Sequence, residues 1–364
     1  MAYTTIDYEA LKAFSLHVFE KFGYTPEESA IITSVLLTSD LYGIESHGIQ
    51  RMALYYRCIQ NGRIDLHAKW ETVHETPLSA VIDAHACIGQ LVSHYAMNRA
   101  IEKAKAHGAG FVTVRNSNHF GIAGYYAKMA VEKGLIGMAT TNSVPIMVPT
   151  YASTAMLGSN PLAFAAPAEP YDFFFDASTT VVTRGKVEVY TKKNEPLPEG
   201  WTVDEKGLPG HDAGYILNNI NQRLGGGILP LGGATEQLGG HKGYGYGMVS
   251  ELFSSILSLG LTSNHIDGIS PGGICHGFIA IDPHLFGDPD AIKAHFSAFL
   301  QELRQSPKAE GQSRIYTHGE KEVEATARIR KEGVPVNEKT IEEMRQICQD
   351  LNIDMTSFLG EITF

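Results

Sequence analysis

Strand-like and helix-like segments alternate through the middle of the chain, and few fold classes accommodate this alternation. Apolar residues recur at helical spacing over residues 96–104, Gly108 follows, and the apolar run 111–114 is typical of a strand. Further strand-like runs occupy residues 135–141, 162–166, 173–176 and 278–282. The pattern predicts an α/β (α+β) fold rather than a β-sandwich.

The N-terminal segment is expected to be helical. Thr25 and Glu28 have the spacing of a capping box, with Pro26 at the first helical position, so a helix should begin there and end near Gly43. An earlier helix should end at Gly23, because four apolar residues before it lie on one stripe. These residues are Leu11, Phe14, Val18 and Phe22.

A third helix is predicted from about Ser46 to Gly62. His47 would lie in its first turn, and Arg51 would lie four residues later on the same face. A C-terminal helix capped by Asn337 is also predicted. Its buried face would carry Ile341, Met344, Ile347 and Leu351.

Residues 185–247 are rich in glycine and proline and show little periodicity, which predicts a long excursion of loops. We therefore expect two regions. A helical N-terminal domain, 1–75, would be joined by the C-terminal helices of 285–364, and residues 76–284 would form an α/β region that contains a cofactor-binding domain.

Composition excludes several classes of partner. The net charge of −11 disfavours binding to a nucleic-acid backbone, which needs clustered Lys and Arg. No apolar run approaches the roughly 20 residues of a membrane span. The four cysteines are far apart and form no C-x-x-C pair, so we expect neither a structural zinc site nor a disulfide framework, and a reducing, cytoplasmic compartment fits best.

Two histidines are candidates for proton transfer, because an imidazole titrates near neutral pH. His47 is followed by Arg51, whose guanidinium could hold a carboxylate; the alternative is an ordinary surface helix start. A helix N-terminus would keep His47 neutral. His119 follows the strand-like run 111–114 and could face a pocket; the alternative is a histidine that is hydrogen-bonded within a turn.

Other polar clusters could hold a cofactor or close a turn. They are residues 140–143, residues 158–161, the segment Asp176 to Thr180, and Lys242 among the glycines of residues 240–247. Several motifs are missing: G-x-G-x-x-G, the P-loop, H-E-x-x-H and G-x-S-x-G. None of the 15 histidines shows a metal-ligand spacing, so no metal site is expected.

Taken together, the segments resemble the malate/L-lactate dehydrogenase family, which is unrelated to the Rossmann-type lactate and malate dehydrogenases. The matching features run in order along nearly the whole chain. They are residues 43–48 with Arg51, residues 115–121, residues 141–143, residues 158–162, Asp176 with Ser178, and residues 242–245.

The resemblance implies helical N- and C-terminal regions around a non-Rossmann, mixed-sheet domain that binds NAD or NADP. It implies a homodimer that transfers a hydride between the nicotinamide and a small 2-hydroxy/2-oxo acid, with malate/oxaloacetate or lactate/pyruvate as first candidates. His47 and His119 would face the reacting carbon, and Ser46 and Arg51 would hold the substrate carboxylate. The residues implied for the cofactor are Ser143, Asp176, Ser178, Thr179, Lys242, Gly319 and Glu320.

Alternatives stay open at this point. Within the family, the substrate could be a cyclic-imine carboxylate, sulfolactate, ureidoglycolate or a sugar acid. Outside it, the chain could be a binding protein that kept the pocket, or a histidine-based metalloenzyme. Which histidine transfers the proton, the choice between NAD and NADP, and the direction of the reaction in the cell do not follow from the residues.

Overall fold

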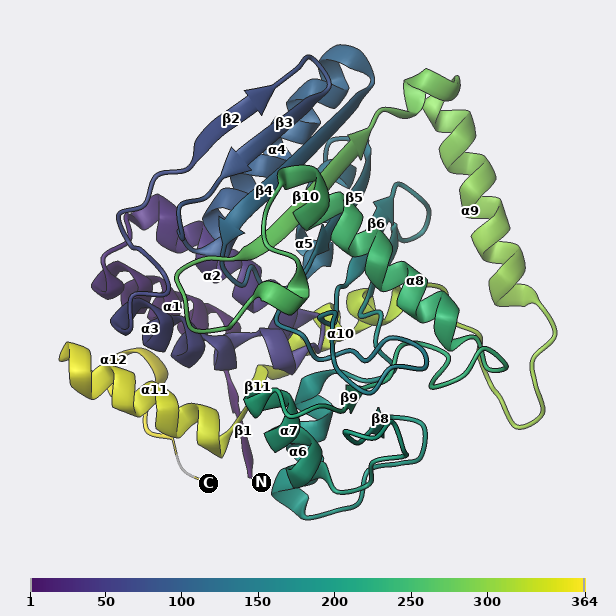
Figure 1. Cartoon of the computed structure of the whole chain (residues 1–364). Helices are drawn as coiled ribbons and strands as arrows, with labels where there is room; N and C mark the ends of the chain where they lie inside the picture. The colour runs from purple at the N-terminus through teal and green to yellow at the C-terminus, as the bar shows by residue number, and fades with distance from the viewer. Residues whose placement is uncertain (1, 363) are drawn as a thin grey trace.

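The computed structural model describes residues 2–362 and 364, and it confirms the α/β (α+β) class (Figure 1). One layer consists of helices from both ends of the chain, with a short ribbon formed by β1 (Tyr3–Ile6) and β11 (Val334–Asn337). These helices share one apolar core. They are α1 (Tyr8–Phe22), α2 (Pro26–Leu41), α3 (Met52–Gln60), α10 (Glu320–Glu332), α11 (Glu338–Leu351) and α12 (Thr356–Leu359).

The structure confirms the predicted ends of three helices. Helix α1 ends at Gly23, whose φ of 115° lies in the left-handed region that glycine tolerates. Both hydrogen bonds of the capping box between Thr25 and Glu28 are present at the start of α2. The side chain of Asn337 caps α11 by accepting the Thr340 N–H.

The second layer is a seven-stranded sheet in the order β2-β3-β4-β10-β5-β6-β7. Among the described strands of this sheet, only the β3–β4 pair is parallel, so the topology differs from that of a Rossmann domain. The bounds are β2 (Glu71–Glu75), β3 (Ser79–Asp83), β4 (Ala109–Ser117), β5 (Ile136–Thr141), β6 (Leu162–Ala166), β7 (Phe173–Ala177) and β10 (Ile274–Ile281).

Helices cover both faces of this sheet (Figure 1). On one face lie α4 (Gly89–His107) and α5 (Ala123–Val131), and their apolar sides form a second core with the strands. On the other face, α8 (Gly240–Glu251) leads into a π-helical turn, η3 (Leu252–Ile256), that packs on β10. The long helix α9 (Pro289–Gln305) lies beside the β6–β7 end of the sheet, where Phe296 contacts Phe173.

The prediction of loops over residues 185–247 is wrong. This stretch contains α6 (Arg184–Lys193), α7 (Ala213–Gln222) and the β8–β9 pair (Thr202–Val203 and Gly227–Ile228), which enclose a small core. The glycine-rich residues 240–247 are helical as well, as the first part of α8. The apolar spacing is weak in α6, whereas α7 carries Ala213, Ile216 and Ile220 at helical spacing within an otherwise glycine- and proline-rich stretch.

The prediction of one helix from Ser46 is also wrong in detail. Residues 45–51 form two 3-10 turns, η1 (Glu45–His47) and η2 (Ile49–Arg51), and α3 begins only at Met52. A buried carboxylate interrupts the helix, because Asp40 accepts the N–H of Ile49 at 2.8 Å. Among the helices that the structure describes, none is long and apolar enough to cross a membrane.

Candidate active site

The two predicted histidines meet where the helical layer touches the sheet. His47 comes from η1, and His119 comes from the loop that follows β4. Their rings are stacked, with centroids 5.3 Å apart and planes inclined by 30°. Both residues are half-buried. The fold thus brings together two imidazoles that lie 72 residues apart in the sequence.

Tyr55 is a member of this cluster that the sequence reasoning missed. It lies on α3, is 1% exposed, and its hydroxyl is 2.8 Å from Nδ1 of His119. This contact occupies Nδ1 and leaves Nε2 of His119 available for a substrate. The signal in the sequence was the spacing of Tyr55 four residues after Arg51, but buried tyrosines at helical spacing are too common for that to be specific.

Arg51 and Ser46 adjoin His47. The Nε–H of Arg51 donates to the carbonyl oxygen of Ser46 at 2.6 Å, and its terminal guanidinium nitrogens have no hydrogen-bond partner among the described residues. The Ser46 hydroxyl lies 2.9 Å from Nδ1 of His47. A carboxylate held by Arg51 would therefore lie beside both imidazoles.

The side chain of Asp40 fixes the turn that carries His47. The carboxylate of Asp40 packs so tightly on Gly48 that a Cβ at that position would lie 1.8 Å from Oδ1. Burial raises the pKa of Asp40 well above its usual range, while the Ile49 N–H opposes that rise. Gly48 is thus required for close approach, and Asp40 positions the turn.

Both histidines are neutral at physiological pH. Burial, followed by the positive charge of Arg51, lowers the pKa of His47 to about 3. Burial also lowers the pKa of His119 well below its ordinary value, and His47 and Arg51 add to this effect. The expectation that His47 is neutral is therefore correct, but the cause is burial rather than a helix dipole. Two stacked rings cannot both carry a proton at low cost, so the pair titrates as one unit.

The loop after β5 places Ser143 differently from the polar residues before it. Asn142 is fully buried and bonds to Glu251, to the Leu261 carbonyl and to the Cys275 N–H, so its amide is committed to the fold. Ser143 is partly accessible, and its only protein partner among the described residues is a carbonyl at 3.4 Å. Gly158 packs against it, since a Cβ there would lie 2.2 Å from the Ser143 hydroxyl oxygen.

The residues after β7 fall into two kinds. Asp176 accepts the Gly124 N–H at the start of α5, and burial raises its pKa to about 6. Thr179 is 2% exposed, and its hydroxyl donates to the carbonyls of Ser159 and Asn160. Ser178 is partly accessible and contacts the Thr180 hydroxyl. The Ser178 hydroxyl also accepts the Thr180 N–H and lies 3.4 Å from the Ser159 carbonyl, so both Ser178 and Thr179 stabilise the loop, and Ser178 alone is partly accessible.

Lys242 and Glu320 also differ in their surroundings. Lys242 is exposed in the first turn of α8 and pairs with none of the acidic residues that the structure describes. Glu320 is 1% exposed and binds Arg304, Arg314 and Thr317, which keep its pKa at about 2 despite its burial. Its oxygens are thus occupied. Gly319, before it, caps α10 with a φ of 107°.

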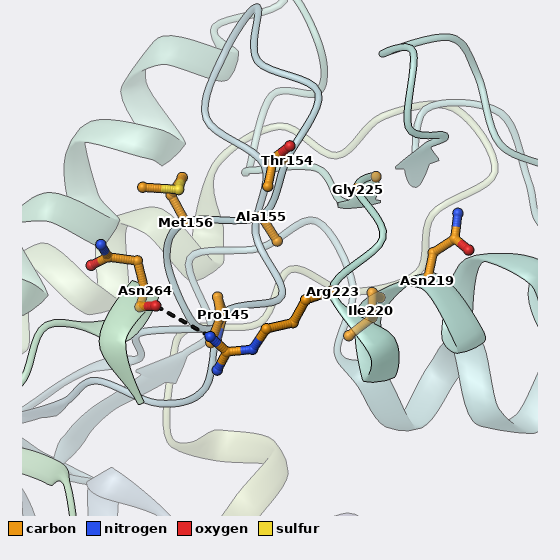
Figure 2. A pocket seen from close by; sticks show the side chains of 10 residues that line it. Pro145, Thr154, Ala155, Met156, Asn219, Ile220, Arg223, Gly225 and Asn264 are labelled. Atoms are coloured by element: carbon orange, nitrogen blue, oxygen red, sulfur yellow. Dashed lines mark hydrogen bonds between the residues drawn. The ribbon is translucent and has the colours of Figure 1, made fainter. Parts of the chain in front are cut away.

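A cavity of about 160 Å³ lies away from the histidines, between α7 and the loops around residues 145–156 and 264. Figure 2 shows Arg223 extending through it toward Asn264, whose carbonyl oxygen it bonds at 3.3 Å. None of the sequence-predicted site residues lines it. Among the described residues, no group of three or more metal-ligating side chains occurs.

Neutral imidazoles beside the Arg51 guanidinium, in a fold without Rossmann topology, have the groups that acid–base chemistry on a small carboxylate requires. The family model for malate/L-lactate dehydrogenase matches residues 6–345. Malate dehydrogenase of Pyrococcus abyssi is 40% identical over 353 residues, covering 96% of each chain. L-sulfolactate dehydrogenase of Methanocaldococcus jannaschii is 34% identical and covers 96% of this chain and 97% of its own.

A solved structure has the same fold. Malate dehydrogenase from Entamoeba histolytica superimposes with a TM-score of 0.93 at 34% identity, covering 97% of this chain and 99% of its own. The chain belongs to the malate/L-lactate dehydrogenase family. It is an oxidoreductase that acts on the CH–OH group of a hydroxy acid with a nicotinamide cofactor.

Proposed function

We propose that this chain interconverts malate and oxaloacetate with NAD or NADP. The observation that carries the chemistry is the stacked pair His47 and His119 beside Arg51. The choice of malate rests on relatives named malate dehydrogenase, from Pyrococcus abyssi and Pyrococcus horikoshii, at 40% and 39% identity. Lactate, sulfolactate, ureidoglycolate and cyclic-imine carboxylates are the alternatives that a substrate panel must include.

Arg51 orients the substrate. Its free guanidinium nitrogens would grip the carboxylate next to the reacting carbon, and Ser46 would add a hydroxyl contact. Binding the carboxylate in a fixed pose turns one face of the carbonyl toward the cofactor and converts a random encounter into an ordered one. A second carboxylate, as in malate, would need a further partner that the residues named here do not specify.

His119 is proposed to transfer the proton. Tyr55 holds Nδ1, so Nε2 is directed to the substrate oxygen. Because burial keeps the imidazole neutral, it can take the proton from the hydroxyl as malate is oxidised. The resulting imidazolium would be stabilised by the Tyr55 oxygen. His47, whose Nδ1 contacts Ser46, would polarise the same substrate oxygen.

The cofactor fits the residues beside the loop after β5. Hydroxyls of Ser143 and Ser178 and the exposed ammonium of Lys242 are suitable partners for ribose and phosphate groups, and Gly158 leaves the backbone room. When bound, the nicotinamide supplies or accepts the hydride. Asp176 would act indirectly, by accepting the Gly124 N–H and so fixing the start of α5. Thr179, Gly319 and Glu320 would stabilise the backbone next to the cofactor site.

A homodimer is proposed on the basis of one exposed apolar surface. Helix α8 and the π-turn η3 present a row of large apolar side chains to solvent, which is unusual for a monomer. These residues are Tyr246, Met248, Val249, Leu252, Ile256 and Leu257. Light scattering of the wild type and of Leu252→Glu tests this: the wild type should be a dimer, and the variant a monomer.

We also place the enzyme in the cytoplasm, because its four cysteines are free and buried.

The activity is tested by following NADH and NADPH absorbance with a panel of 2-oxo acids and cyclic imines. We expect turnover with oxaloacetate and loss of that turnover in His119→Asn. His74→Asn, on the exposed strand β2, is the matched control and should keep wild-type rates. Cofactor binding without oxidation or reduction of any acid would refute the proposed function and favour a binding protein.

A further inference from the structure

His276 is a buried imidazole to which the proposed chemistry assigns no task. It lies on the central strand β10, is 0% exposed, and has a hydrogen-bond partner at each nitrogen. Nε2 is 2.9 Å from the Ser117 hydroxyl, and Nδ1 is 2.8 Å from the Thr141 hydroxyl. The ring therefore bridges β4 and β5, the two strands that flank β10.

Each of these partners lies two residues before a proposed functional residue. Ser117 ends β4 and precedes His119, and Thr141 ends β5 and precedes Ser143. A single side chain thus joins the loop that carries the proton-transferring group to the loop that contacts the cofactor. Ladder hydrogen bonds join β10 to both strands, but the pairing with β4 is interrupted by a bulge between Ile274 and His276. The side-chain contacts extend the connection where the ladder is irregular.

A third contact acts on the same loop. The His276 ring stacks on Phe120 with centroids 4.4 Å apart and planes inclined by 5°. Phe120 is 2% exposed and is the residue directly after His119. The loop that carries His119 is therefore fixed by a hydrogen bond on one side of that residue and by ring stacking on the other.

The hydrogen-bond network indicates which nitrogen carries the proton. The Thr141 hydroxyl lies 2.9 Å from the carbonyls of both Asn142 and Cys275, so its hydrogen is directed to a carbonyl. Its oxygen then accepts from Nδ1–H of His276, and Nε2 lies 2.9 Å from the Ser117 hydroxyl. Both nitrogens are used, and neither is free to exchange protons with a substrate. The arrangement suits a fixed support better than an acid or base.

We propose that His276 is a positioning residue that sets the separation and angle between the His119 imidazole and the cofactor site at Ser143. The inference rests on the proposed function, because in that reaction the hydride leaves the carbon and the proton leaves the hydroxyl oxygen bonded to it, so the cofactor and His119 must hold a fixed geometry. Small displacements of reacting groups lower rates steeply, so the connection between the loops has a kinetic consequence beyond stability.

Three substitutions separate the contacts. His276→Phe keeps a ring for stacking and loses both polar contacts. His276→Asn places its amide near the position of Nδ1 and retains the Thr141 contact, whereas His276→Gln reaches the position of Nε2 and retains the Ser117 contact. Ala280→Gly is the control, because Ala280 is 0% exposed on the same face of β10 but lies away from both loops.

For His276→Phe we expect kcat to fall by about 100-fold with a much smaller change in the cofactor Kd, and the isotope effect with deuterated reduced cofactor to rise as hydride transfer becomes rate-limiting. Asn and Gln should each restore part of kcat. Amide hydrogen exchange of the free protein should increase in both segments 117–121 and 141–143 in the Phe variant, in 117–121 alone in the Asn variant, and in 141–143 alone in the Gln variant. If the Phe variant does not fold, the same measurements are made on the Asn and Gln variants, each of which should loosen one of the two loops.

Two outcomes would overturn the inference. One is a kcat at the wild-type level in the variants. The other is a loss of kcat that matches Ala280→Gly at equal loss of Tm, with the isotope effect and hydrogen exchange of both loops unchanged. A wild-type protein that reduces no acid refutes the proposed function instead, and the exchange measurement then reports separately on whether His276 connects the loops.

Discussion

Replacing Tyr55 by phenylalanine removes one oxygen from the site and leaves the ring in place. The hydroxyl is 2.8 Å from Nδ1 of His119, and the side chain is 1% exposed, so water cannot readily substitute for it. When His119 takes up a proton, this contact becomes a hydrogen bond from a charged donor. Such bonds contribute roughly 1.5–3 kcal/mol. The loss falls mainly on the charged state, because the neutral imidazole loses only an ordinary hydrogen bond.

At 1.36 kcal/mol for each factor of ten, we expect kcat to fall roughly 10- to 150-fold in Tyr55→Phe. KM for the acid should change little, since Arg51 binds the carboxylate. The assay is initial-rate kinetics with oxaloacetate and reduced cofactor, with Tm measured alongside. Tyr24→Phe is the control: it makes the same chemical change in the same apolar core, at a hydroxyl with no partner among the described residues. A kcat within twofold of wild type would refute the role of Tyr55 in holding His119.

Three further predictions follow from the same geometry. Arg51→Lys should lower kcat/KM roughly 10- to 100-fold through KM, because a lysine cannot bind a carboxylate with two parallel bonds; an unchanged KM would place the carboxylate elsewhere. Gly89→Ala would put a Cβ 2.3 Å from the carbonyl oxygen of Asn118 and 2.6 Å from that of His119, so it should cost about 1–3 kcal/mol of unfolding free energy and lower kcat. Gly185→Ala, in an open position, is its control; equal effects in the two would contradict this. His47 is neutral when folded, with a pKa of about 3, but takes up a proton near pH 6.5 when unfolded. Below that pH the wild type should lose stability relative to His47→Asn by up to about 1.4 kcal/mol per pH unit, measured by urea unfolding between pH 7 and 5; a pH-independent difference would show that folding leaves the pKa of His47 unshifted.

The local signals in the sequence were sufficient for the regular elements. The strand-like run at residues 162–166 matches β6 residue for residue, and the capping residues Thr25 and Asn337 act as expected. Such signals are short-range, because capping and alternation depend on neighbours within a few residues. Helix α6 was missed because only Val187 marks its buried face. Helix α7 was missed although Ala213, Ile216 and Ile220 have helical spacing, because glycine- and proline-rich segments surround it. Both are stabilised by a small core.

The residues of the candidate site were likewise only partly predictable from local signals in the sequence. His47, His119 and Arg51 were identified from their residue types, their positions near the ends of elements and the family resemblance, and the structure brings the two histidines together. Tyr55 was not identified, because nothing local distinguishes it from a core tyrosine. The sequence also gave no sign that the helix expected from Ser46 is interrupted by Asp40, a residue that precedes the turn and reaches it only through tertiary packing.

By itself the amino-acid sequence determined the α/β class, most strands and helix ends, the family, and the two histidines with their arginine. Only the tertiary structure decided the order of the strands, the stacking of His47 on His119, the tyrosine at Nδ1, and the low pKa values of both rings. The physical reason is that hydrogen-bonding preferences and periodicity act over a few residues. Burial, ring stacking and contacts between loops arise only when segments far apart in the chain are packed together.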